Sequence, residues 1–290
     1  MRYPMLKKKM TYAQEFLAAQ PDLFECPKCH EELQLVDVQS LGCVNNHRYN
    51  LSKKGTIHFP DHHVSSDYDK EMLEHRRFMI QSGLYQPIIK TLQAILKEYQ
   101  HQVIVDMGCG EGSFLIELIK GLDNVDAAIG FDLSKDGVLL ASDYASDGFW
   151  FVGDITAMPF QNQSVDCLLN IFSPSHYDEM SRVLTNDGLV IKVIPEQNYL
   201  KEMRMLFYRD KEDKQNYSNE KIYNKFQDSM KIIDEKRCTY TVPVTSENYE
   251  HMLGMSPLMW GASQAAKEYA LNHPFKELTV DVKILIAKKA

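Results

Sequence analysis

Residues 103–112 read VIVDMGCGEG, a short β-branched strand that runs directly into a glycine-rich turn. An apolar pattern with helical spacing follows it over residues 113–119. Gly108, Gly110 and Gly112 allow the backbone to turn sharply and allow a ligand to approach it closely. A buried strand, a glycine turn and a helix in this order predict the first unit of a nucleotide-binding α/β fold.

The charges around this turn distinguish two kinds of ligand. Asp106 ends the strand and Glu111 lies within the turn. A dinucleotide site holds a pyrophosphate with the pattern G-x-G-x-x-G, whereas position 113 is a serine here and the spacing is G-x-G-x-G. Carboxylates repel phosphate but attract a cationic sulfonium and its amino-acid moiety. The turn therefore favours S-adenosylmethionine (SAM) over NAD and over a purely structural Rossmann-like domain.

Two further strands are expected to end in acidic residues. Asp132 closes the strand at 127–132, 20 residues past Gly112, the distance at which a carboxylate meets ribose hydroxyls. Asp154 closes a strand at 149–154, where a methyltransferase contacts the adenine amino group. Three acid-terminated strands in succession support a SAM site.

The alternation of strands and helices continues to the C-terminus. We expect strands at 165–172 and 189–194 with a helix over 177–184 between them, and strands near 238–244 and at 278–287. This pattern predicts an α/β fold with a mostly parallel, seven-stranded sheet covered by helices on both faces. Ligands should gather at the carboxyl ends of the strands.

A metal-ligand pattern precedes this domain. Cys26, Cys29, Cys43 and His47 have the spacing C-x2-C-x13-C-x3-H. Two cysteines spaced in this way can present both thiolates to one ion, and the second pair completes a tetrahedron that suits zinc. Four protein ligands leave no open position, which indicates a structural ion. The alternative is a redox CxxC motif, which needs no third Cys or His.

The chain is expected to divide into an N-terminal extension with a zinc-binding domain (1–65), connecting helices (66–101) and a SAM-dependent methyltransferase domain (102–290). Residues 33–41 suggest a short hairpin arm. The helices should meet near residues 83–87, where a glycine and a proline interrupt the apolar periodicity. Residues 196–236 are polar and helical, and they predict an insertion into the last domain.

Composition limits the choice of partners. A chain of 290 residues with 44% hydrophobic residues can bury a full core. The net charge of −8 argues against a protein that grips nucleic acid with its whole surface, because phosphate contacts need Lys and Arg. Any RNA-facing surface should include the first 60 residues, which are slightly basic. No segment approaches the ~18 apolar residues of a membrane span, so we expect a soluble, cytoplasmic protein.

Several side chains outside the glycine turn could contact RNA. Lys53 and Lys54 follow a strand in a tight turn, and Arg76 and Arg77 lie near the helix break. Trp260 follows a proline in the C-terminal half. The alternatives are solvated lysines and arginines and a tryptophan packed in the core. The candidates are Lys53, Lys54, Arg76, Arg77 and Trp260. His62 and His63 are expected not to bind the metal, because the four-ligand set is already complete.

Several motifs appear in a recognisable order along the chain. They are Cys26-x2-Cys29, Cys43-x3-His47, the turn at 49–55, Arg76-Arg77-Phe78, Gly83-Leu84-Tyr85, the turn at 106–112, Phe172-Ser173-Pro174 and Ser256-Pro257-x2-Trp260. Together they resemble the bacterial 23S rRNA (guanine-N1)-methyltransferases, a family of class I SAM-dependent methyltransferases with an N-terminal zinc-binding domain. The resemblance covers the chain from about residue 24 to its end.

The resemblance implies a substrate and further site residues. Family members modify a hairpin loop of 23S rRNA, and some of them confer macrolide resistance. Cofactor contacts are implied at the glycine turn, at Asp132, at Tyr85 and near Tyr199, which stands where the family pattern has a histidine. The oligomeric state is open, and a homodimer is one expectation.

The chemistry requires removal of a proton, because guanine N1 is protonated near neutral pH. The sequence does not identify the base, and Asp154, Asn170 and Ser173 are candidates by position only. Two other functions stay open: a SAM-dependent methyltransferase that acts on a small molecule, and a non-catalytic RNA-binding protein that binds SAM for stability.

Overall fold

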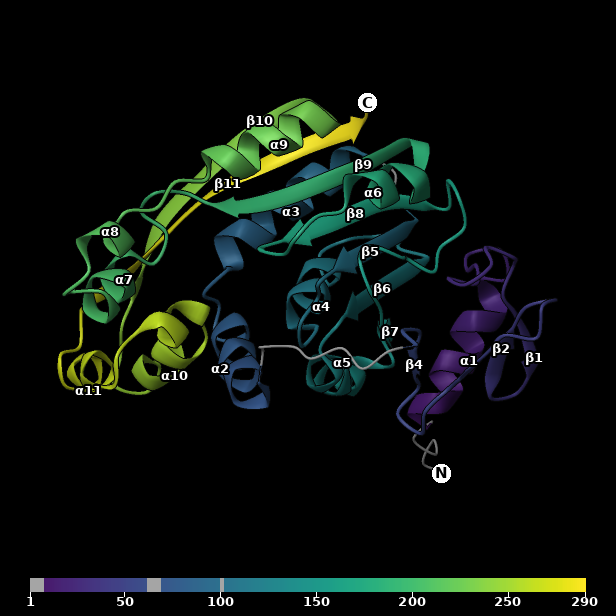
Figure 1. The fold of residues 1–290 in the computed structure, drawn as a ribbon, viewed down its shortest axis with the longest axis horizontal. Coiled ribbons are helices and arrows are strands. Elements are labelled where there is room, and N and C mark those ends of the chain that lie inside the picture. Colours follow the sequence, from purple (N-terminus) through teal and green to yellow (C-terminus); the bar gives the residue numbers. More distant parts are fainter. Residues whose placement is uncertain (1–7, 62–68, 100–101) are drawn as a thin grey trace.

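An eight-stranded sheet runs through the molecule (Figure 1). The computed structural model describes residues 8–61, 69–99 and 102–290. The strand order is β10-β11-β9-β8-β5-β6-β7-β4. In chain order the strands are β4 (Thr56–His58), β5 (Val103–Met107), β6 (Ala127–Asp132), β7 (Phe149–Val152), β8 (Val165–Ile171), β9 (Leu184–Pro195), β10 (Met230–Pro243) and β11 (Glu277–Lys289).

The six strands from β4 to β9 are parallel, whereas β11 is antiparallel to β9 and β10 is antiparallel to β11. The expected mostly parallel sheet is therefore confirmed for the seven strands β5 to β11. The eighth strand, β4, comes from the N-terminal segment and pairs with β7. The order reverses between β5 and β8, and this is where an open α/β sheet forms its ligand crevice.

Helices cover both faces of the sheet (Figure 1). The described helices are α1 (Lys9–Ala19), α2 (Lys70–Gln81), α3 (Gln86–Glu98), α4 (Ser113–Ile119), α5 (Lys135–Ala141), α6 (Tyr177–Val183), α7 (Lys201–Phe207), α8 (Glu212–Gln215), α9 (Glu220–Ser229), α10 (Tyr249–Gly254) and α11 (Gln264–Asn272). The expected break between two connecting helices is confirmed, because α2 ends at Gln81 and α3 begins at Gln86. None of the helices in the described ranges is both long and apolar enough to span a membrane.

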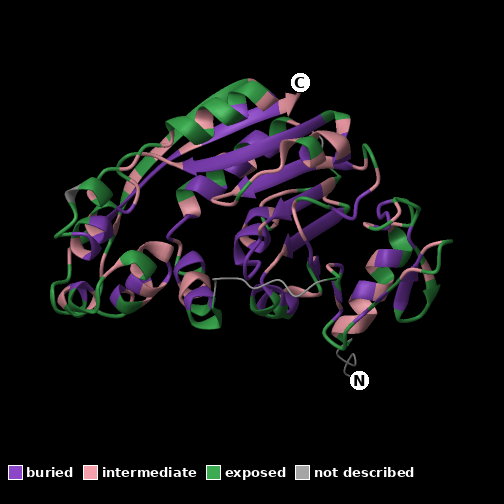
Figure 2. Ribbon diagram, in the orientation of Figure 1, coloured by how far each residue is buried: buried purple, intermediate pink, exposed green. Residues whose placement is uncertain are grey.

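Each face of the sheet has its own core. Successive strand residues point to opposite faces, so Ile104 packs with α2, α3 and α4, whereas Val105 and Met107 pack with α1, α6 and α9. Figure 2 shows the central strands buried between these layers, with the outer side of α9 exposed. Asp106 lies on the same strand face as Ile104, at the carboxyl end where β5 turns into the glycine loop.

The N-terminal segment packs directly on the sheet. A small antiparallel sheet, β1 (Gln34–Asp37), β2 (Ser40–Gly42) and β3 (Arg48–Asn50), includes the expected hairpin arm. The ring centroid of Phe24 lies 5.7 Å from that of Phe149 and 6.2 Å from that of Phe151, both in β7. The ring centroid of Phe59 lies 5.1 Å from that of Phe151. Helix α1, which the sequence analysis did not predict, joins the same core through Leu17.

Several strand boundaries differ from the expectations. β7 ends at Val152, before Asp154. β9 begins at Leu184 because Leu184 pairs with Val165, and β10 begins at Met230 because Met230 pairs with Lys289. β10 is an edge strand whose residues are mostly exposed. Its polar composition therefore resembled a helical insertion, although the helix α9 already ends at Ser229.

Candidate cofactor cleft and metal-ligand cluster

The glycine turn at the end of β5 can be built only with glycine at two positions. Gly108 has a φ of 77° and Gly112 a φ of 84°, in the left-handed region that side chains disfavour. A Cβ atom on Gly108 would lie 2.6 Å from the Cβ of Ser173, and one on Gly112 would lie 2.9 Å from the ring of Trp150. The turn therefore packs closely against the end of β8 and against β7.

Two adjoining cavities lie along the carboxyl ends of β5, β6 and β8. One has a volume of about 210 Å³ and the other about 250 Å³. They share Arg76, Gly108, Ile171 and Phe172 in their walls, so they form one cleft. The first half contains the predicted residues Tyr85, Asp106, Glu111 and Tyr199, and the second contains Gly110 and Asp132.

Glu111 is already neutralised by a neighbouring cation. Its Oε2 accepts a hydrogen bond from Arg77 Nε at 3.0 Å, and its Oε1 accepts one from the hydroxyl of Ser113. The second branch of the Arg77 guanidinium donates to Asp143 at 3.1 Å. Arg77, a candidate RNA contact in the sequence, therefore instead ties the glycine turn to α2 through ion pairs.

Asp106 has no such partner. It is 2% exposed, and its Oδ1 is the one buried side-chain oxygen or nitrogen in the described residues without a hydrogen-bond partner. Burial, together with the charges of Asp132 and Glu111, raises the pKa of the Asp106 carboxyl to about 8. An unpaired carboxyl in the wall of a cleft is suited to a ligand that brings a positive charge.

Asp132 holds the glycine turn from the neighbouring strand. Its Oδ2 accepts a hydrogen bond from Gly110 N and its Oδ1 accepts one from Ser134 N, both at 2.8 Å. Burial raises the pKa of this carboxyl. Each carboxylate oxygen has a second lone pair, so Asp132 can still accept hydrogen bonds from hydroxyls of a ligand in the cleft.

Three rings enclose the other end of the cleft. The hydroxyl oxygens of Tyr85 and Tyr199 are 2.6 Å apart, and the ring of Phe172 stacks on Tyr199 with a centroid distance of 5.1 Å. Burial raises the pKa of both tyrosines. Phe172 has a φ of 55°, a strained conformation for an aromatic residue that often marks a functional site. Sequence reasoning identified Phe172 only as part of a family motif.

The three candidate catalytic residues have different positions. Asn170 is fully buried, and its Nδ2 donates to Ser173 Oγ at 2.6 Å and to Pro174 O at 2.7 Å. Ser173 lines the cleft and donates its hydroxyl proton to Met107 O at 2.7 Å. Asp154 is outside the walls of both cavities, and its Oδ1 accepts hydrogen bonds from Thr156. Asn170 therefore shapes the loop after β8 from behind.

The remaining RNA candidates are dispersed. Lys53 and Lys54 are exposed in the turn between β3 and β4, outside the cleft. Arg76 lines both halves of the cleft and donates to Met255 O at 3.3 Å. Trp260 is 46% exposed, so the alternative that it packs in the core is wrong. His62 and His63 lie outside the described residues.

The four predicted metal ligands converge. The Sγ atoms of Cys26, Cys29 and Cys43 and a ring nitrogen of His47 all lie within 4.8 Å of one another. The three sulfurs are 3.3–3.5 Å from His47 Nδ1. Hydrogen bonds, first of all with Asn45, lower the pKa of the Cys29 thiol to about 6, which favours the thiolate that zinc binds. Three sulfurs and one imidazole at these separations fit a tetrahedral zinc site.

Comparisons with known proteins agree with this geometry. A methyltransferase domain model matches residues 104–188. A Bacillus subtilis (strain 168) protein, YxjB, named as a 23S rRNA (guanine-N1)-methyltransferase, is 34% identical over 92% of this chain and 97% of its own length. The 23S rRNA (guanine(748)-N1)-methyltransferase of Streptomyces fradiae is 22% identical over 91% of this chain and 95% of its own.

One solved structure supports the fold. It is a chain from the complex of the Haloferax volcanii Trm112 methyltransferase activator with a methyltransferase, which is 17% identical and has a TM-score of 0.51. The match covers 78% of this chain and 99% of that one.

Proposed function

Because this chain belongs to the 23S rRNA (guanine-N1)-methyltransferase family, we propose that it transfers a methyl group from SAM to N1 of a guanine in a hairpin loop of 23S rRNA. The observation that supports this best is the unpaired carboxyl of Asp106 in the wall of the cleft, beside the glycine turn. A target in a hairpin loop is favoured because a base leaves its stack there at the least cost.

SAM, when bound, supplies the activated methyl group as a cationic sulfonium. Asp106 provides the compensating charge for the cationic part of this molecule. Asp132 accepts hydrogen bonds from the ribose hydroxyls, and Gly153 borders the half of the cleft that suits adenine. Glu111 acts through Arg77, because this ion pair keeps the turn in the shape that places Asp106 in the wall of the cleft.

The acceptor end of the cleft is proposed to lie beside Phe172, where Tyr85 and Tyr199 are proposed to contact the cofactor. These rings exclude water and can orient a flat base against the methyl donor, which is the main task in an in-line displacement. Asn170 and Ser173 are proposed as positioning residues, because their hydrogen bonds hold the loop that carries Phe172. Asp154 is proposed to close the adenine end and not to act as the base.

The Cys26, Cys29, Cys43 and His47 cluster is proposed to bind one structural zinc ion. Its fit rests on three convergent sulfurs and one imidazole nitrogen. The ligands fill a tetrahedron without an open position, so the ion stabilises the N-terminal segment and takes no part in methyl transfer.

Methyl transfer can be tested with the purified chain, tritiated SAM and unmodified 23S rRNA. We expect label in the RNA, and nucleoside mass spectrometry should identify it as 1-methylguanosine. Ribonuclease treatment of the acceptor should abolish the transfer. Label that survives ribonuclease would favour a small-molecule acceptor, and RNA binding without any label would favour a non-catalytic RNA-binding protein.

The affinity for SAM should depend on pH through Asp106. A cationic ligand needs the ionised carboxyl, but below pH 8 the free protein holds this group protonated. The dissociation constant should therefore rise roughly tenfold for each pH unit below 8, since each unit costs about 1.36 kcal/mol. Calorimetry in two buffers of different ionisation enthalpy should show protons released on binding at pH 7. An affinity that increases as the pH falls would contradict this role.

A further inference from the structure

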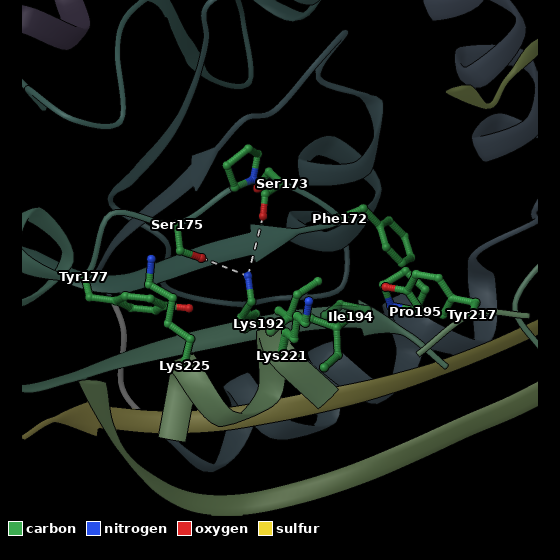
Figure 3. A pocket seen from close by; sticks show the side chains of 13 residues that line it. Phe172, Ser173, Ser175, Tyr177, Lys192, Ile194, Pro195, Tyr217, Lys221 and Lys225 are labelled. Atoms are coloured by element: carbon green, nitrogen blue, oxygen red, sulfur yellow. Dashed lines mark hydrogen bonds between the residues drawn. The ribbon is translucent and has the colours of Figure 1, made fainter. Parts of the chain in front are cut away.

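A third cavity adjoins the cofactor cleft at the loop after β8 (Figure 3). Its volume of about 570 Å³ lies within the range of ~300–1,000 Å³ typical of small-ligand sites. Phe172, Ser173, Pro174 and Pro195 belong both to its wall and to the wall of the cleft. A ligand in this cavity would therefore lie next to the group that receives the methyl.

Three lysines converge on this cavity from two elements. Lys192 comes from β9, and Lys221 and Lys225 come from consecutive turns of α9 (Figure 3). In the described ranges, no carboxylate oxygen lies within 4.0 Å of any of their ammonium groups. The cavity thus concentrates positive charge in a protein whose net charge is −8.

Lys192 differs from the other two lysines because its side chain is buried. It is 3% exposed, and its Nζ donates to Ser175 Oγ at 2.8 Å and to Asn170 Oδ1. These acceptors are neutral, so they satisfy its hydrogen bonds but leave its charge uncompensated. Desolvation accordingly lowers the pKa of Lys192 to about 8. Buried lysines are normally paired with an acid, so an anion from outside is the missing partner.

Aromatic and apolar groups complete the wall. Tyr177 and Tyr217 lie at opposite ends of the cavity in Figure 3. Lys225 Nζ lies 5.7 Å from the ring centroid of Tyr177, and the guanidinium carbon of Arg204 lies 5.3 Å from that of Tyr217. Ile222, which is 40% exposed, is a neighbour of Lys221 on α9. Rings beside cations are what proteins use to bind unpaired nucleotides.

A solvated helix face is the simplest alternative for Lys221 and Lys225. It does not account for Lys192, which is buried and borders the same cavity as the two exposed lysines. Nor does it account for the apolar Ile222 exposed beside them. A ligand with both anionic and flat apolar parts explains the whole set.

We propose that this cavity is a subsite for the unpaired ribonucleotide next to the target guanine. Its phosphate is neutralised by Lys192, Lys221 and Lys225, and its base packs on a tyrosine ring. The proposal rests on the proposed RNA substrate. It adds a specific place where this acidic protein can grip the backbone, because phosphate contacts need local clusters of cations.

The test compares the double variant Lys221→Glu/Lys225→Glu with the wild type on a 23S rRNA transcript. RNA affinity is measured by filter binding at several salt concentrations. We expect the dissociation constant to rise at least about tenfold, and the slope of log affinity against log salt to fall by about 1.4, since each contact with a single strand contributes about 0.7. The affinity for SAM should stay within about twofold of the wild type.

Lys97→Glu is a single-site control for charge reversal elsewhere on the surface. Lys97 is also an exposed helical lysine, but it lines a cavity at the amino ends of β5 and β6, on the other edge of the sheet. This variant should bind RNA with the wild-type salt dependence. Lys192→Gln keeps a polar group near Ser175 and Asn170. It should lower the slope of log affinity against log salt by the contribution of one further phosphate contact.

The outcomes separate the two proposals. If wild type methylates the transcript and the double variant binds it with unchanged affinity and slope, the subsite is wrong and the methyl transfer stands. If wild type transfers no methyl group to RNA, the proposed function is wrong, whereas a reduced salt slope in the double variant would still support the subsite. A similar loss in Lys97→Glu would overturn the subsite, because the effect would then be one of net charge alone.

Discussion

Replacing Asp106 by asparagine is expected to weaken SAM binding by about 30-fold or more, because loss of one member of a buried charge pair costs about 2 kcal/mol or more. The same change should stabilise the protein without ligand. The buried carboxyl of Asp106 has its pKa raised to about 8 from a usual value of 3.8. Asparagine does not titrate, so it avoids the free-energy cost of holding this carboxyl protonated at a pH above its usual pKa.

The pH dependence of this stabilisation has a definite sign. A raised carboxyl pKa means that the folded protein binds this proton more tightly than the unfolded chain does. The contribution of Asp106 to stability is therefore fully present below pH 3.8 and is lost as the pH rises to about 8. The melting temperature of Asp106→Asn should exceed that of wild type by roughly 5 °C or more at pH 7.5, since ~2–4 °C corresponds to 1 kcal/mol. The difference should shrink towards pH 4.

Glu111→Gln provides a matched control in the same turn. Glu111 is also a buried acid, but it is paired with Arg77. Its replacement removes the buried one of the two carboxylates that pair with the largely buried Arg77 guanidinium, and only the exposed Asp143 is left, so this variant should melt below wild type. Calorimetric titration with SAM and scanning calorimetry at several pH values would measure both effects. A fall in the melting temperature of both variants would contradict the assignment of Asp106 as an unpaired ligand group.

Removal of the metal is expected to have the second large effect. Each chain should contain one zinc ion, and a chelator or the substitution Cys43→Ser should lower the melting temperature by roughly 10 °C or more, because a structural zinc site contributes several kcal/mol of folding free energy. The effect should extend beyond the N-terminal segment. Phe24, two residues before the proposed ligand Cys26, packs against Phe149 of the sheet, and β4 forms the edge of this sheet.

Cys238→Ser is the control for this prediction. Cys238 is a half-buried cysteine of β10, outside the ligand cluster. It should keep its zinc and melt within a few degrees of wild type. Metal content by plasma mass spectrometry, thermal unfolding and limited proteolysis across residues 20–60 would test the three statements. Protein that melts normally and contains no metal would refute a structural ion.

Much of the fold could be predicted because its signals are local. The glycine turn and the acids at or near the ends of β5 and β6 are encoded within a few residues, as is the helix break between α2 and α3. The polar edge strand β10 was partly missed, since its exposed residues lack the apolar pattern of a buried strand. Helix α1 was missed too, although its buried Leu17 joins the core.

In the candidate site, too, the sequence predicted the features that depend on local spacing and missed those that depend on contacts between distant residues. Spacing alone predicted the convergence of the four proposed metal ligands, because short loops restrict where they can lie. It could not distinguish Asp106 from Glu111, since the distinction depends on Arg77, a residue 34 positions before Glu111. Nor could it reveal the cavity with Lys192, whose walls combine residues of β9 and α9 that are distant in the sequence.

The sequence by itself determined the fold class, the glycine turn that suits a cationic cofactor and the candidate cysteine and histidine ligand set. These properties follow from backbone geometry and from charges close together along the chain. Only the tertiary structure decided which buried acid lacks a partner, that β4 extends the sheet, and that Trp260 is exposed. Such properties depend on desolvation and on contacts between distant segments, and neither is defined until the chain has folded.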